Sequence, residues 1–180
     1  LAINHTITRN TGNGQFRTGE KDNLNITHSS NTTQQAINGF AAPWFKGTVT
    51  YSGDNKQTLV KGTYQNLIIS GAGERNIREK VNLKGILRME SGTLLTNDSL
   101  TLKSDSANTA LISHKGTGAL SGKVEIERFI HGSGEQEILF GTAFQNAILR
   151  DYTEDMPILG PDGVQLSSGA NATVWEYRSE

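Results

Sequence analysis

Apolar and polar residues alternate along much of the chain. Val49 and Tyr51 alternate with Thr in 48–51, and in 123–130 we expect Val124, Ile126 and then Phe129 or Ile130 to face inward. This spacing is typical of half-buried β-strands, because successive side chains of a strand point to opposite faces. Helical periodicity appears in one short candidate, residues 142–150. Turn residues separate the strand-like runs, and the dipeptide Ser-Gly recurs among them, at 52–53, 70–71 and 91–92. The pattern predicts an all-β protein.

A short phrase of the form Asn-Leu-x-Ile returns along the chain. It starts at Asn23 and Asn66, and looser forms start at Asn82 and Ser99, so the later starts are 16 and 17 residues apart. A coil of about this length holds two or three short strands, and stacked coils would join their apolar rows into one core. We therefore expect a parallel right-handed β-helix, or solenoid. An antiparallel β-sandwich also has strands and turns at such intervals, and it stays open as an alternative.

The pattern changes near residue 131. Strand-like runs at 137–141 and 172–177 flank an acidic loop with prolines at 151–163. We predict two parts, a β-solenoid repeat region at 1–131 and the start of a small β-sandwich-like segment at 132–180. The second part ends directly after a strand-like run, so we expect the chain to be a piece of a larger parent protein.

The composition narrows the class of protein. Gly, Thr, Asn and Ser number 20, 19, 15 and 14, together about 38% of the 180 residues, whereas charged residues are 19%. Helical cytosolic enzymes carry more Ala, Glu, Lys and Leu, so this composition favours an extracellular β protein. The net charge of −1 gives no basic excess for a nucleic-acid partner. The chain has no Cys and no apolar run long enough for membrane insertion.

Residues with catalytic chemistry are scattered. Four His residues show no metal-binding spacing, and the Gly-rich run 116–122 precedes a predicted strand, whereas a phosphate loop needs a helix there. The acidic residues Asp151, Glu154 and Asp155 offer oxygen ligands for calcium, but their spacing matches no EF-hand, and this site is left open. We therefore predict no catalytic residues, no cofactor and no metal site, and a protein that is not an enzyme.

A second group of residues gives a weaker indication of a carbohydrate-binding site. Trp44 offers a ring for stacking on a sugar, and Arg78 and Arg88 belong to a basic run over 75–88. On a β-helix these side chains would form a groove for glycan contact if they shared one face. The alternatives are core packing for the Trp and a solvated charged face for the Arg residues. A carbohydrate-binding or polysaccharide-acting β-helix is thus the second function hypothesis.

Several phrases of the sequence resemble one protein family. They are Gly47–Tyr51, Tyr64–Gly71, Gly85–Leu95 and the long stretch from Leu100 to Ile130. In this order they resemble the large secreted surface proteins of Bacteroidota that the type IX secretion system exports. The likeness is good over 47–180 and looser over 1–46. Segment 131–140 departs from the family, because it is rich in Gly and Glu where an Arg- and Trp-rich strand is common.

The resemblance implies a fold, a location and a set of partners. It implies a parallel β-helix over 47–130 and export to the cell surface or beyond, past the outer membrane. It also implies contact with the type IX translocon or with surface carrier proteins during export. Bacteroidota O-glycosylate a short Asp-(Ser/Thr)-aliphatic motif, which makes Ser99 in Asp98–Leu100 and Ser106 in Asp105–Ala107 candidate O-glycosylation sites.

The leading function hypothesis is a non-enzymatic structural or adhesive segment of a repeat-containing cell-surface protein. It rests on the repeats, the small polar composition and the lack of a catalytic constellation. Its expected partners are other modules of the parent chain or further copies, because the open end of a stack can be extended. Surface glycans are a further expected partner, and no nucleic acid is expected.

Overall fold

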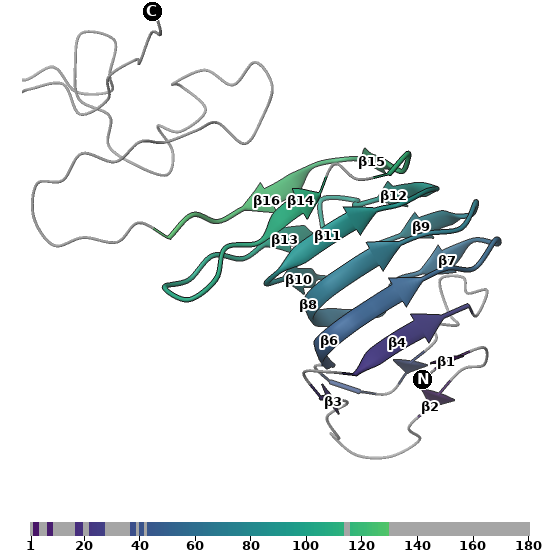
Figure 1. The fold of residues 1–180 in the computed structure, drawn as a ribbon, viewed down its shortest axis with the longest axis horizontal. Coiled ribbons are helices and arrows are strands. Elements are labelled where there is room, and N and C mark those ends of the chain that lie inside the picture. Colours follow the sequence, from purple (N-terminus) through teal and green to yellow (C-terminus); the bar gives the residue numbers. More distant parts are fainter. Residues whose placement is uncertain are drawn as a thin grey trace, which may run out of the picture. The chain divides into compact units, whose positions relative to one another are not determined.

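The computed structural model describes residues 2–3, 7–8, 17–19, 22–27, 37–38, 40–41, 43–113 and 116–129. All of them belong to the first of the two units into which the chain divides, Leu1–Ser133 and Gly134–Glu180. The predicted sandwich-like segment 132–180, the helix candidate 142–150 and the acidic loop 151–163 therefore lie outside the described residues. Over the described ranges, every regular element is a β-strand (Figure 1).

The strands form one large sheet, one smaller sheet and one isolated pair (Figure 1). The ten-stranded sheet comprises β1 (Ala2–Ile3), β3 (Arg17–Thr18), β4 (Asn23–Ile26), β6 (Trp44–Tyr51), β8 (Gly62–Ile69), β10 (Val81–Leu83), β11 (Ile86–Met89), β13 (Leu100–Leu102), β14 (Leu111–Ser113) and β16 (Val124–Ile126). The four-stranded sheet comprises β7 (Gln57–Thr58), β9 (Glu74–Asn76), β12 (Thr93–Leu95) and β15 (Ala119–Ser121). The isolated pair is β2 (Ile7–Thr8) with β5 (Ile37–Asn38).

The chain alternates between the two larger sheets. From β6 to β14, each strand or strand pair of the ten-stranded sheet is followed by one strand of the four-stranded sheet, and we call such a unit a pass; β16 begins a further pass. Successive passes pair in parallel register, as between β6 and β8 and between β7 and β9. The protein is thus all-β with parallel strands, and the antiparallel sandwich alternative is wrong for this part of the chain.

The register corrects the predicted repeat length. Val81 pairs with Gly62 on one side and with Leu100 on the other, so these two steps are 19 residues each rather than 16 or 17, and the next step, from Leu100 to Val124, is 24. Asn82 lies opposite Thr63, not opposite Asn66, while Leu67 lies opposite Leu87. The third pass divides into β10 and β11, and both present inward aliphatic residues. Similar phrases therefore occupy two different positions on a pass, which shortens the apparent repeat.

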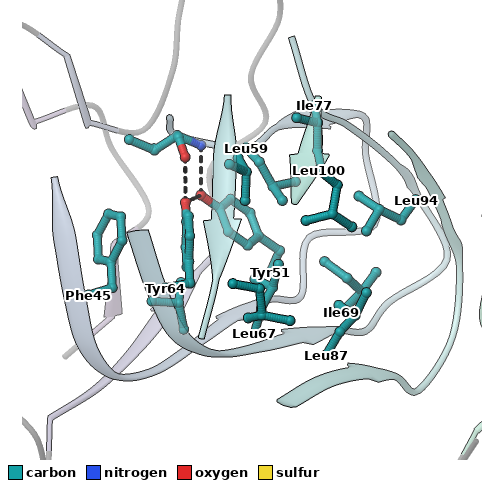
Figure 2. Packing of buried hydrophobic residues seen from close by; sticks show 14 of the residues in the cluster. Phe45, Tyr51, Leu59, Tyr64, Leu67, Ile69, Ile77, Leu87, Leu94 and Leu100 are labelled. Carbon is teal, nitrogen blue, oxygen red and sulfur yellow. Dashed lines mark hydrogen bonds between the residues drawn. The ribbon is translucent and has the colours of Figure 1, made fainter. Parts of the chain in front are cut away.

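Alternation of side chains builds the core. In β6 half-buried residues alternate with buried ones, and in β11 exposed residues alternate with buried ones. Aliphatic side chains from the four-stranded sheet and its flanking turns face those of the ten-stranded sheet (Figure 2). The facing residues are Leu59, Ile77 and Leu94 on one side and Leu67, Ile69 and Leu87 on the other, all at most 1% exposed.

Two tyrosines form a polar centre inside this core. Their hydroxyl oxygens lie 3.0 Å apart, Tyr64 donates to the carbonyl of Val60, and the Val60 N–H donates to Tyr51 (Figure 2). The ring of Phe45 stacks on Tyr64 with centroids 4.5 Å apart. Burial raises the pKa of Tyr51 to about 12 and that of Tyr64 well above its ordinary value. Both phenols thus remain neutral and satisfy the main chain of Val60.

The predicted turns lie between the sheets. Gly71 and Gly92 have φ of +78° and +72°, a region that glycine enters without a steric penalty. A Cβ on Gly71 would lie 2.8 Å from the carbonyl oxygens of Ser52 and Gly53 on the preceding pass. The Ser-Gly turns therefore stack on one another, and this close approach is the physical reason for their recurrence in the sequence.

Candidate functional site

The two predicted O-glycosylation sites lie in turns of different construction. Ser106 is exposed at the tip of an excursion between β13 and β14, which the bridge between Ser104 and Thr109 closes. Asp105 Oδ1 accepts hydrogen bonds from the N–H groups of Ala107 and Asn108, both at 2.9 Å. These bonds, followed by contact with Lys84, lower the pKa of Asp105. The carboxylate thus holds the backbone on either side of an outward-facing serine.

Ser99 is less exposed than Ser106 and lies in a tighter turn. It follows Asn97 and Asp98, whose φ values of 46° and 56° place both in the left-handed region, and its N–H donates to the carbonyl of Thr96 at 3.0 Å. Its side chain is half-buried, and its hydroxyl donates to the carbonyl of Asn97 at 3.1 Å. The next residue, Leu100, is 1% exposed in the core. The geometry therefore leaves Ser106 more accessible to an enzyme than Ser99.

The three candidate glycan contacts do not form one cluster. Trp44 is half-buried at the start of β6, where the ammonium of Lys46 lies 4.8 Å from its ring centroid. Arg88 is exposed on β11, where it pairs with Glu90 of the same pass. Arg78 is exposed in the turn between β9 and β10. The residues come from three different segments, and the register places Arg88 opposite Ile68 rather than opposite a residue near Trp44.

A buried guanidinium is the polar feature that sequence reasoning missed. Arg75 on β9 is 0% exposed, and its register partners are Gln57 and Leu94, so it occupies an inward position. Its Nη atoms donate to main-chain carbonyls of two stacked turns, those of Gly53, Ser70 and Gly73, with a longer contact to Tyr51 at 3.4 Å. Burial lowers its pKa, against the opposing effect of Asp54.

Arg75 fastens successive passes together. Gln57 extends the same arrangement one pass earlier, because its Nε2 donates to the carbonyl of Ile26 at 2.9 Å and its Oε1 accepts from the N–H of Gly53. An Arg within a basic run is usually interpreted as exposed. The available signal was its place in a short strand directly after a Ser-Gly turn. The arrangement binds carbonyl groups of the chain itself.

Side-chain hydrogen bonds also join neighbouring passes to one another. Thr101 donates to Glu125 at 2.6 Å, and Asn97 donates to both Asn76 and the carbonyl of Ile77. Asn97 and Thr101 thus join neighbouring passes through their side chains. Lys103 pairs with Glu127 and, as the main cause, lowers the pKa of that carboxyl.

Other candidate chemistry in the described ranges is sparse. The Gly-rich run 116–122 contains β15 and is followed by the strand β16, as the sequence predicted, rather than by the helix of a phosphate site. Across the residues that the structure describes, His, Asp and Glu do not gather in a group of three that would hold a metal ion. Asp151, Glu154 and Asp155 lie outside these ranges. Among the described residues no helix has the length and hydropathy that crossing a membrane requires.

Comparison with known proteins returns no relative. No family model matches the chain, and no curated protein or solved structure matches it. The resemblance to exported surface proteins of Bacteroidota therefore stays a prediction from the sequence.

Proposed function

We propose that this chain is a non-enzymatic structural or adhesive segment of a larger secreted cell-surface protein. The observation that supports it is the continuous stack of parallel passes from β6 to β16, which hydrogen bonds and ion pairs join on the outside. Such a stack extends in one direction and offers length and surface rather than an enclosed pocket. The described polar side chains mostly bind neighbouring passes of the chain itself.

The finer fold belongs to the same proposal. A right-handed parallel β-helix would connect the two larger sheets by the turns at 52–56, 70–73 and 90–92. The alternation of the chain between sheets and two successive steps of 19 residues support it. A crystal structure in which the two sheets belong to separate layers without this winding would contradict it.

The proposed location follows from the resemblance to substrates of the type IX secretion system. Protease treatment of intact source cells should release peptides of this chain, and mass spectrometry should detect them. Loss of the translocon should abolish the release. Recovery of the protein only from the cell interior would overturn the proposal. In the exported protein, we expect Ser106 to carry an O-glycan more completely than Ser99.

The carbohydrate-acting alternative has less support. Trp44, Arg78 and Arg88 lie on separate segments, so they do not form the shared groove that this hypothesis needs. A glycan array with the wild-type chain tests it, with the double variant Arg78→Ala/Arg88→Ala as the comparison. Binding that the double variant loses would favour the alternative over the structural proposal.

A further inference from the structure

At the end of the described stack, β14, β15 and β16 each lack a neighbour on one side among the described strands. β16 ends the ten-stranded sheet and β15 ends the four-stranded sheet, so among the described strands each has a neighbour on one side only. Leu120, Val124 and Ile126 pack on the core from one side and remain half-buried. A strand edge of this kind is a template for another extended segment, because its N–H and C=O groups continue the ladder.

Ion pairs between passes have a constant polarity. Four pairs in the described residues join neighbouring passes, and in each of them the Lys lies on the earlier pass and the carboxylate on the later one. They are Lys56–Glu74, Lys61–Glu79, Lys84–Asp105 and Lys103–Glu127. Each pass therefore presents ammonium groups toward the pass that follows it.

Lys123 continues this pattern at the open edge. The register aligns Gly62, Val81, Leu100 and Val124 in one column, so Lys61, Lys80, Ser99 and Lys123 occupy equivalent positions. Among these four, Lys61 is the residue for which the described part of the chain shows an ion pair. Lys61 Nζ lies 2.9 Å from Glu79 Oε2, and Glu79 stands two residues before Val81. The side chain of Lys123 is exposed and has no ion pair within the described residues. The main-chain N–H of Lys123 donates to Asp98 Oδ1 at 3.2 Å.

We propose that the free edge of β16 accepts an extended parallel strand from a partner polypeptide, with a carboxylate two residues before the residue opposite Val124. Aliphatic residues at alternate positions of that strand cover Val124 and Ile126. The main-chain ladder and the aliphatic contacts supply the affinity, and the carboxylate facing Lys123 sets register and choice of partner. A strand with a neutral or basic residue there is disfavoured, because the ammonium loses solvation without compensation. The inference does not depend on a surface location.

The chain itself supplies a probe. A labelled peptide with the sequence of residues 77–84, Ile-Arg-Glu-Lys-Val-Asn-Leu-Lys, contains the strand that pairs beside Lys61 in the fold. Its control carries Glu79→Lys. Fluorescence anisotropy with the full chain should show about fivefold tighter binding of the acidic peptide, since reversal turns an attractive surface contact into a repulsive one. The chain variant Lys123→Glu should invert this preference, and Lys56→Glu, within an earlier pass, should leave it unchanged.

Three results would overturn the proposal. One is equal binding of both peptides, and another is no binding to a full chain whose circular dichroism shows intact β structure. The third is self-association of the chain alone in sedimentation velocity that Lys123→Glu abolishes, because a second copy would then occupy the edge. Each result concerns the purified chain, so it is separate from failure of the proposed surface function.

Discussion

Replacement of Arg75 by Met tests whether the buried guanidinium stabilises the stack. Met has a similar length and fills much of the same volume, but it donates no hydrogen bond. In the variant, the carbonyl groups of Gly53, Ser70 and Gly73 lose the donor that the structure gives them. The substitution therefore separates the effect of these hydrogen bonds from the effect of an empty cavity.

The expected magnitude follows from opposing contributions. Three carbonyl groups that lose their partner cost about 1–3 kcal/mol each, because they are enclosed between stacked turns. Two effects oppose this loss. The variant no longer keeps a charged group away from water, and the buried Met side chain stabilises the folded state by about 1.5–3 kcal/mol. We expect the free energy of unfolding to fall by about 3 kcal/mol for Arg75→Met. Arg75→Ala should cost about 2 kcal/mol more, because it also leaves a cavity.

Urea unfolding followed by circular dichroism measures these differences. The matched control is Arg78→Met, three residues away and exposed, which should change the free energy of unfolding by less than about 0.5 kcal/mol. Buried ion pairs in other proteins have been replaced by apolar residues with a gain in stability. If Arg75→Met were as stable as the wild type or more so, the inference that the guanidinium holds the turns together would be wrong.

Three further predictions concern the core and the turns. Burial raises the pKa of Tyr51 to about 12 and also raises that of Tyr64. The stability that the two neutral phenols contribute is therefore complete below pH 10 and is lost as the pH rises further. A flat profile of unfolding free energy between pH 9 and 12 would contradict this. Gly71→Ala should destabilise the chain by about 1–3 kcal/mol in urea unfolding, since its φ is +78°, and unchanged stability would refute close packing of the turns. The chain has no Cys, so a single introduced thiol can be labelled on its own. Ser106→Cys should react with a thiol reagent at least about ten times faster than Ser99→Cys, because position 99 is half-buried in a tight turn. Equal rates would argue against the difference in access.

The alternation of apolar residues correctly predicted strands at 48–51 and at 124–126, where β6 and β16 lie. Val124 and Ile126 were expected to face inward, and both pack against the core. Phe129, a further candidate for an inward position, is 48% exposed, because β16 ends at Ile126 and the alternation no longer determines direction beyond it. The Ser-Gly dipeptides also marked turns correctly, since their chemistry is local.

The register in which the strands pair could not be predicted from the sequence. A short phrase such as Asn-Leu fits several inward positions of one pass, and the pairing of Leu67 with Leu87 is decided by which apolar rows close the core together. The same holds for the site residues. The local sequence separates Arg75, which is buried, from Arg78, which is exposed, only by the nearer Ser-Gly turn, because their difference in burial depends on the turns of two neighbouring passes.

The sequence by itself determined that the chain is all-β, where it turns and which side of each strand is apolar, because these properties depend on neighbouring residues. Only the tertiary structure decided the parallel pairing, the register between passes, the burial of Arg75 and the constant direction of the Lys–carboxylate pairs. These features arise between passes, from residues that stand far apart along the chain. Their physical origin is the need of each pass to cover its apolar row and its backbone groups with the next.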